Sequence, residues 1–288
     1  IGYGTQKKVN LTGAVATVDT KALESRPVSQ VGQALQGTVP GLNLSTADLG
    51  GQLGQSMKVN IRGTGTIGTG SKGEPLILID GMEGNMNTLN PEDIESISVL
   101  KDAASSSIYG SRAAFGVILI TTKKGKAGKM TINYNNSFRY SGPTNLPNQL
   151  DSYRFANFFN EAAVNQGDKI IFDEETIGRI QDYMAGKITT TTIPNGSNWH
   201  FHEKANDNWY KTHFTWAWSQ EHNLSMSGGT EKLQYYVSGS YLNQNGNLRY
   251  GNDNMKRYNL SAKINTKINK YIDFNLSTKF IRYDLDNP

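Results

Sequence analysis

The second half of the chain alternates apolar and polar residues at every second position. In the segment 132–140, one face carries Ile132, Tyr134, Phe138 and Tyr140, and the other carries Asn133, Asn135, Ser137 and Arg139. Segments that begin at residues 233, 258 and 272 repeat this pattern, and 223–228 is a weaker fifth. Period two is typical of β-strands with one apolar face. Each run is close to the roughly 9–11 residues that a tilted strand needs to cross a bilayer.

The connections between these segments are short at one end and long at the other. Tight turns are predicted at 230–232 and 268–270, and long loops at 142–220 and 243–255. Outer-membrane barrels have this asymmetry, with aromatic residues near the strand ends. A soluble β-sandwich also alternates, but its strands usually have about 5–6 residues. The pattern therefore favours antiparallel transmembrane strands, and five of them are too few to close a wide barrel.

Before residue 129 the pattern is different, because short helix-like and strand-like segments follow each other. A helix is predicted at 28–35, with Pro27 before it and Gly37 after it, and buried strands are predicted at 76–79 and 116–122. This mixture indicates a small α+β domain. We therefore expect an α+β domain at 1–129 and strands at 130–288.

The long loop at 142–220 is predicted to contain structure of its own. One helix is expected at 151–165, burying Phe155, Phe158 and Phe159, and a second is expected to begin after Asp173. All four tryptophans lie in this region or at its end: Trp199, Trp209, Trp216 and Trp218. They are consistent either with the core of the insertion or with a surface that stacks on sugar rings or other ligands.

Composition excludes several classes of protein. The mean hydropathy of −0.52 and apolar runs of only four residues, such as 76–79, exclude a helical membrane protein. A net charge of +4 over 288 residues gives no support for nucleic-acid binding. The absence of cysteine excludes disulfides, thiolate metal sites and cysteine nucleophiles. Because the chain begins with Ile1 rather than methionine, we expect it to be a piece of a longer protein.

Motifs that would carry enzymatic chemistry are incomplete. Residues 63–68 spell G-x-G-x-x-G, with Glu83 twenty residues after the first glycine, but the sequence that follows does not favour a helix. Residues 98–101 spell S-x-x-K without the partner motifs of penicillin-binding enzymes. The His-Phe-His-Glu run at 200–203 lies in a predicted loop and lacks the spacing of a zinc helix. We therefore expect no enzyme, no catalytic residue, no cofactor and no metal.

One stretch carries a specific resemblance. Residues 107–125 read SIYGSRAAFGVILITTKKG, which closely resembles the signature of the SusC/RagA family of TonB-linked outer-membrane transporters of Bacteroidota; Phe115 stands where the family usually has Asn. Further blocks of the family occur in order along the chain, at 2–8, 12–15, 37–41, 61–63, 79–81, 90–102, 227–232 and 244–246. The resemblance therefore spans the whole chain.

The resemblance implies a 22-stranded barrel in the outer membrane, closed by an N-terminal plug. Residues 1–129 would be that plug domain, and 130–288 would be the first barrel strands, with 142–220 as an extracellular insertion. The segment Ile1, Gly2 and Tyr3 would contact TonB, and Arg62 would lock the plug to barrel carboxylates. A SusD-like lipoprotein would cover the barrel as a lid, and the substrate would be an oligosaccharide or an oligopeptide.

Under this interpretation, the loops at the outer end of the plug are the candidate substrate sites. They carry polar side chains after two predicted strands: Thr66, Ile67, Thr69, Lys72, Met82, Glu83, Asn85 and Asn87. The function implied is TonB-dependent import of a glycan or peptide nutrient. A surface nutrient-binding or adhesin module on a β-scaffold, without transport, is the alternative.

Overall fold

The structure is a computed structural model. It describes residues 15–19, 28–46, 52–61, 73–101, 107–189, 192–195, 198–201 and 206–287. The chain forms two compact units. The first comprises residues 1–141, 217–246 and 251–288, and the second comprises 142–216 and 247–250.

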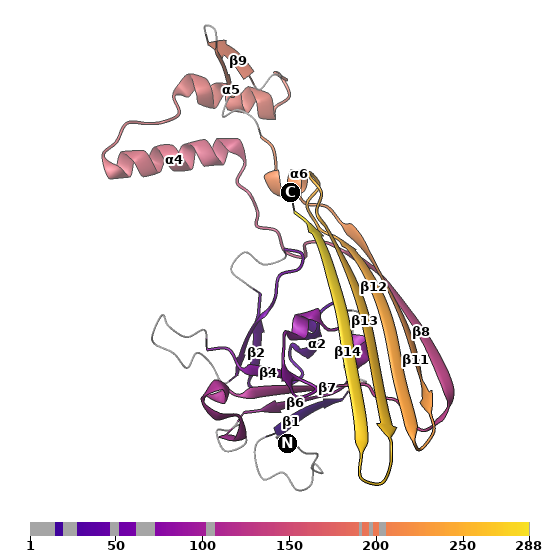
Figure 1. Ribbon diagram of the computed structural model, residues 1–288. Coiled ribbons are helices and arrows are strands. Elements are labelled where there is room, and N and C mark those ends of the chain that lie inside the picture. Colours follow the sequence, from indigo (N-terminus) through magenta and orange to yellow (C-terminus); the bar gives the residue numbers. More distant parts are fainter. Residues whose placement is uncertain are drawn as a thin grey trace. The chain divides into compact units, whose positions relative to one another are not determined.

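A curved antiparallel sheet, here called the wall, forms one part of the first unit (Figure 1). Its five strands are β8 (Gly128–Ser141), β11 (Ala217–Gly229), β12 (Leu233–Asn245), β13 (Asn254–Lys267) and β14 (Asp273–Asp286), in the order β14-β13-β12-β11-β8. The strands have 13 or 14 residues, longer than the alternating runs alone predicted. Thr230 closes the β11–β12 turn, where its hydroxyl accepts hydrogen bonds from the amides of Lys232 and Leu233.

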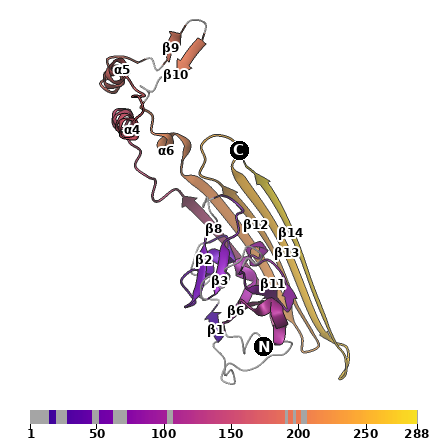
Figure 2. The same cartoon turned by 90° about the vertical axis from the view of Figure 1, so that its left-hand side faces the viewer.

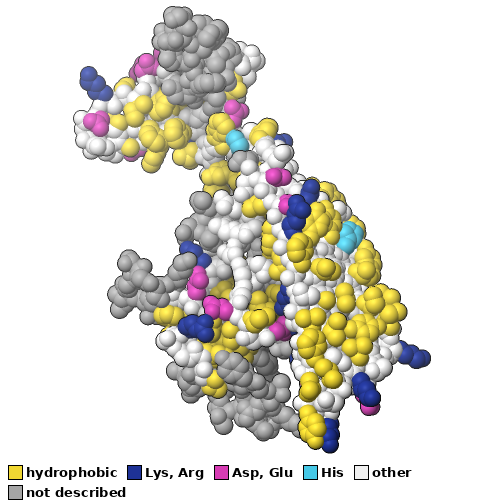
Figure 3. Space-filling model, viewed as in Figure 1, with side chains coloured by type: hydrophobic (Ala, Val, Ile, Leu, Met, Phe, Trp, Pro, Cys, Tyr) yellow, Lys and Arg dark blue, Asp and Glu magenta, His cyan; other side chains and the backbone are white. Residues whose placement is uncertain are grey.

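The two faces of the wall follow the sequence alternation. Apolar side chains on the outer face remain exposed, including Phe138 at 61%, Leu260 at 55% and Phe280 at 59%. Figure 3 shows hydrophobic side chains spread over these strands. On the inner face, by contrast, Arg257, Ser261 and Lys263 are buried. This confirms the prediction of antiparallel strands with one apolar and one polar face.

The chain before β8, here called the N-terminal domain, lies along the inner face of the wall (Figures 1 and 2). Its main sheet has the order β1-β6-β7-β4-β5, in which β4 and β7 are parallel. The strands are β1 (Val15–Asp19), β4 (Leu76–Ile79), β5 (Met82–Glu83), β6 (Ile94–Leu100) and β7 (Val117–Thr122). A hairpin of β2 (Leu42–Ser45) and β3 (Lys58–Ile61), the helix α2 (Val31–Leu35) and the 3₁₀ turns η2 (Met86–Thr88), η3 (Pro91–Asp93) and η4 (Ser107–Ala113) complete it.

The hydrophobic core of this domain lies between its sheet, α2 and the β2–β3 hairpin. Leu35, Met86 and Ile97 are fully buried there. The helix predicted at 28–35 begins only at Val31, after the extended Gln30. Together with the wall, this α+β domain confirms the predicted fold class.

The second unit contains the two helices that the sequence predicts in the long loop. They are α4 (Ser152–Gln166) and α5 (Glu174–Met184), followed by β9 (Thr192–Asn195), β10 (Asn198–Phe201) and α6 (Trp209–His213). Asp151 and Asp173 cap the helices by accepting hydrogen bonds from the amides of Arg154 and Thr176. The hydrogen bonds from the Thr176 amide and hydroxyl lower the pKa of Asp173.

The predicted burial of the aromatic face of α4 is wrong. Phe155, Phe158 and Phe159 are 44%, 59% and 39% exposed, and Ala156 and Ala163 are buried instead. The reason is that α5 packs against the small side chains of α4, where Ala156 joins Phe172 and Ile180 in a minimal core. Three of the tryptophans also stay more than half exposed, so they do not form the core of the insertion: Trp209, Trp216 and Trp218. The side chain of Trp199 lies outside the described part of the chain.

Candidate functional site

A row of polar contacts joins the N-terminal domain to the inner face of the wall. Three of them come from the turn around η3: the Asn135 amide donates to Glu92 Oε2 at 3.1 Å, the Asn90 amide donates to Asn223 Oδ1 at 2.7 Å, and the Tyr236 hydroxyl donates to Asp93 Oδ1 at 2.9 Å. These partners lie on β8, β11 and β12 respectively. The domain therefore docks on neighbouring strands mainly through hydrogen bonds, with one small apolar cluster in which Leu53 meets Leu242 of β12 and Met255 of β13.

The sequence Asn-Pro-Glu-Asp fixes the shape of this turn. Asn90 caps it by accepting a hydrogen bond from the amide of Glu92 at 3.0 Å, and Pro91 occupies the first helical position. Asp93 is 8% exposed and Tyr236 is 5% exposed, so their hydrogen bond is shielded from water. A hydrogen bond to a charged acceptor contributes about 1.5–3 kcal/mol in such a setting.

Asp80 makes the next contact in the row. It occupies the two-residue turn between β4 and β5 together with Gly81, and both residues have positive φ, at 51° and 89°. Asp-Gly is favoured in such turns because both positions need a left-handed backbone. The Asp80 carboxylate accepts hydrogen bonds from the Thr122 amide at 2.9 Å and from the Thr122 hydroxyl at 2.8 Å. These bonds hold the carboxylate at the ends of the parallel strands β4 and β7.

Two wall lysines complete the surroundings of Asp80. Lys263 on β13 and Lys279 on β14 each place Nζ 3.0 Å from Asp80 Oδ2, and Lys263 also donates to the Thr122 carbonyl at 3.1 Å. Burial by itself raises the pKa of Asp80, but the hydrogen bonds from Thr122 and the charge of Lys263 outweigh it and lower the pKa to about 2. Asp80 is therefore a carboxylate at every physiological pH.

A second charged cluster lies within the wall itself. Glu221 on β11 accepts from Arg139 on β8 at 2.9 Å and from Arg257 on β13 at 3.5 Å. The side chains of Glu221 and Arg257 are only 5% and 1% exposed. Because an unpaired buried charge is costly, these three residues constrain one another's positions.

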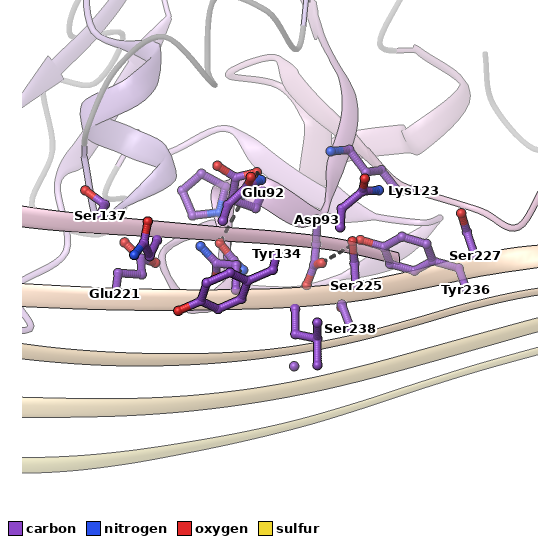
Figure 4. Close-up of a pocket in the computed structure, with 18 of the residues that line it drawn as sticks. Glu92, Asp93, Lys123, Tyr134, Ser137, Glu221, Ser225, Ser227, Tyr236 and Ser238 are labelled. Carbon is purple, nitrogen blue, oxygen red and sulfur yellow. Dashed lines mark hydrogen bonds between the residues drawn. The ribbon is translucent and has the colours of Figure 1, made fainter. Parts of the chain in front are cut away.

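Between the N-terminal domain and the wall lies a polar cavity of about 1170 Å³. Figure 4 shows Glu92, Asp93 and Lys123 of the N-terminal domain and Ser225, Tyr236 and Ser238 of the wall among its lining residues, with Asp93 hydrogen-bonded to Tyr236. Amides and hydroxyls of β8, β11 and β12 make up most of the wall side, including Asn133, Asn135, Ser137 and Asn223. A cavity with this lining holds water or a polar solute far better than an apolar one.

The predicted substrate residues are described only in part. Met82 is 66% exposed, and Glu83 forms an exposed ion pair with Arg112 at 3.0 Å. The Asn85 side chain accepts hydrogen bonds from the amide and side chain of Asn87, whose carbonyl accepts from the Tyr283 hydroxyl at 3.0 Å. The structure thus brings Asn87 beside β14. The remaining residues predicted for this site, for the lock and for TonB contact lie outside the described residues: Thr66, Ile67, Thr69, Lys72, Arg62, Ile1, Gly2 and Tyr3.

The motifs for enzymatic chemistry gain no support. Ser98 lies inside β6, and Lys101 donates to the carbonyl of Pro40, so the two do not form a catalytic pair. The whole G-x-G-x-x-G segment, along with His202 and Glu203, lies outside the described residues. Among the residues that the structure describes, no group of three or more His, Asp or Glu side chains is placed to hold a metal. Nor does the described part of the chain contain a helix long and apolar enough to span a membrane.

The sequence did not reveal which residues carry the docking contacts between the N-terminal domain and the wall. Lys263 and Lys279 appeared only as polar positions on the wet face of their strands, and Asp80 only as the end of a strand. Charged residues on a face otherwise made of Asn and Ser were the available signal. Their partners could not be assigned, because the register of β13 and β14 against the domain depends on the folded structure.

Comparison with known proteins identifies the two parts. The TonB-dependent Receptor Plug Domain family matches residues 7–117. TonB-dependent receptor P3 of Formosa agariphila is 33% identical over 270 residues, which cover 94% of this chain and 23% of that protein. TonB-dependent receptor SusC of Bacteroides thetaiotaomicron is 30% identical over 293 residues, covering 98% of this chain and 26% of that protein. The chain therefore spans about a quarter of the length of these relatives.

A solved structure resembles this chain over nearly its whole length. The RagAB peptide importer in its open-open state superposes with a TM-score of 0.74 and 32% identity, covering 99% of this chain and 32% of that chain. These relatives are receptors and transporters rather than enzymes. The chain belongs to the SusC/RagA family of TonB-dependent transporters, which lie in the outer membrane of Gram-negative bacteria, and it carries the plug domain and the first strands of the barrel.

Proposed function

We propose that the complete protein imports a nutrient actively across the outer membrane, with these 288 residues as the gate. Residues 1–129 form the plug and 130–288 the first strands of the barrel, with 142–220 as an extracellular insertion. The observation that carries this proposal is the polar docking of the plug on the wall, by Asp80, Asn90, Glu92 and Asp93. A wide barrel would leak without a plug, and a plug that must move is better held by hydrogen bonds than by an apolar core.

The partners and substrate follow from the same proposal. A SusD-like lipoprotein forms a lid over the barrel, and the TonB complex pulls on the segment around Ile1, Gly2 and Tyr3. An oligosaccharide or an oligopeptide is the transported solute; one relative is named as a peptide importer. The protein catalyses no reaction and needs no cofactor. Under the pull, the plug opens locally at its least stable part.

Deletion of residues 1–4 from the complete protein tests this function. Cells should lose uptake but keep surface binding, because energy coupling is removed while the outer binding surface stays intact. Labelled oligosaccharide and oligopeptide mixtures, assayed in parallel, measure both quantities and separate the two substrate classes. Uptake that persists after the deletion would contradict TonB coupling. Binding without uptake by the undeleted protein would favour the adhesin alternative.

Alanine substitution in the loop 82–87 tests the proposed substrate site. Met82→Ala and Glu83→Ala remove side chains that are mostly exposed and make few internal contacts, so folding should be unaffected. Surface binding of the labelled mixture should fall roughly tenfold if each side chain contributes about 1.4 kcal/mol. Lys270→Ala, on the exposed β13–β14 turn, is the matched control. Unchanged affinity in both loop variants would remove this loop from the site.

A further inference from the structure

We propose that Asp80 is the positioning residue that seats the plug on the wall, as one carboxylate clamped by Lys263 and Lys279, and that this clamp must open before the plug can move. The proposal rests on the proposed function as a gated importer and specifies what holds that gate shut. It also differs in polarity from the lock expected at Arg62, because here the carboxylate belongs to the plug and the cations belong to the wall.

Both oxygens of the carboxylate accept hydrogen bonds in this arrangement. Oδ1 accepts from the Thr122 amide, and Oδ2 accepts from the Thr122 hydroxyl and from both lysines. Glutamine or asparagine amides cannot replace such a group, because an amide carries only one acceptor oxygen. The geometry therefore selects a carboxylate at this position rather than a polar side chain in general.

The clamp also differs in charge from the other docking contacts. Asp93 bonds to the neutral hydroxyl of Tyr236 and Glu92 to the neutral amide of Asn135, whereas Asp80 contacts two cations. In the clamp both partners carry a charge, whereas in those two hydrogen bonds only the acceptor does, and burial of the clamp limits screening by salt. The side chains of Lys263 and Asp80 are 6% and 14% exposed. Asp80 therefore joins plug and wall by ion pairs as well as by hydrogen bonds.

When Asp80 leaves the clamp, the wall lysines lose their counter-charge, which is unfavourable. Of the partners that the described residues provide, Lys263 would keep the Thr122 carbonyl if β7 stayed in place and would lose it as well if β7 moved. Lys124, which follows β7, adds a further positive charge near Lys263. Two lysines facing an open lumen attract the carboxylate back, so the clamp should both hold the closed state and restore it after each cycle.

The pH dependence follows from the pKa of Asp80, which is lowered from its ordinary value of 3.8 to about 2 in the closed state. A carboxylate with a lowered pKa stabilises the closed state fully above pH 3.8, and this contribution is lost as the pH falls through about 2. The groups that face Asp80 from the wall are Lys263 and Lys279, and Lys124 lies near Lys263. Acid should therefore open the clamp in the unmodified protein.

Single-channel conductance of the complete transporter in planar lipid bilayers tests the clamp. At pH 7 the channel of the Asp80→Asn protein should open roughly tenfold more often than that of the unmodified protein. This corresponds to a change of about 1.4 kcal/mol in the free energy between the closed and open states. Asp80→Glu should restore part of the closure, since it keeps the charge. Asp284→Asn is the matched control, because it removes a carboxylate from β14 that is 41% exposed and forms an ion pair with Arg282 on the same strand. The unmodified protein should open between pH 4 and about 2.

The proposal would be overturned if the Asp80→Asn protein opened no more often than the unmodified protein. If the Asp80→Asn protein does not insert into bilayers, two other conductance measurements test the clamp. One uses the Lys279→Met variant at pH 7, and the other uses the unmodified protein as the pH is lowered. Lys279 is 23% exposed, so its loss is milder. If the channel stayed closed in both of these measurements, the clamp would also be refuted. A failure of the clamp can be told apart from a failure of the proposed import function, because the conductance measurement needs neither TonB nor substrate.

Discussion

Replacing Gly125 by alanine should prevent the plug from seating on the wall. A Cβ at this position would lie 2.4 Å from the backbone nitrogen and 2.5 Å from the carbonyl oxygen of Tyr235 on β12. That backbone cannot move aside, since Tyr235 is paired with Gly228 on β11 and with Ile264 on β13. The plug must therefore move instead, which should cost about 3 kcal/mol or more.

Urea unfolding of the complete protein in detergent, followed by its heat-dependent mobility on gels, measures this effect. The matched control is Gly178→Ala on α5, where an added Cβ meets nothing within 4 Å. This control should leave stability unchanged or raise it by up to about 1 kcal/mol, because alanine favours helix over glycine. Equal stability of the two variants would show that the close approach of Gly125 to β12 is not maintained.

Replacing Glu221 by glutamine should destabilise the wall by about 3–5 kcal/mol, because it leaves Arg257 buried without a counter-charge. Arg257 is the largest of the fully buried side chains in the described residues, and its Nε has no hydrogen-bond partner there. Glu221 therefore supplies the negative charge that balances it. Arg139, at 15% exposure, would lose the same partner.

The midpoint of urea unfolding in detergent is the measurement, and Glu175→Gln is the control. Glu175 forms a similar 2.9 Å ion pair with Arg179, but its side chain is 77% exposed, so its loss should change stability by less than about 0.5 kcal/mol. A Glu221→Gln protein as stable as this control would mean that water or another group satisfies Arg257.

The wall strands could be predicted from the sequence because alternation is a local signal. Ile132, Tyr134 and Phe138 face outward in the structure as their spacing predicted, and Ser261 and Lys263 face inward. The aromatic face of α4 was predicted wrongly, because periodicity shows which residues share a face but not whether a partner covers that face. Phe158 has the pattern of a core residue and remains 59% exposed.

The docking contacts show the same limit more clearly. The turn of Asn90, Pro91, Glu92 and Asp93 was evident as a capped turn, but its three wall partners lie between 43 and 143 residues away in the sequence. Asp80 and Lys279 are 199 residues apart. No local pattern relates positions at such separations, so their pairing could not be inferred.

The sequence by itself determined the order of parts, the faces of the wall strands, the helix caps at Asp151 and Asp173, and the family. Each of these depends on neighbours within a few residues or on a contiguous motif such as 107–125. Only the tertiary structure decided which charges meet. The register of β13 and β14 places Lys263 and Lys279 on one carboxylate, because strand pairing over 14 residues fixes both lysines relative to the plug.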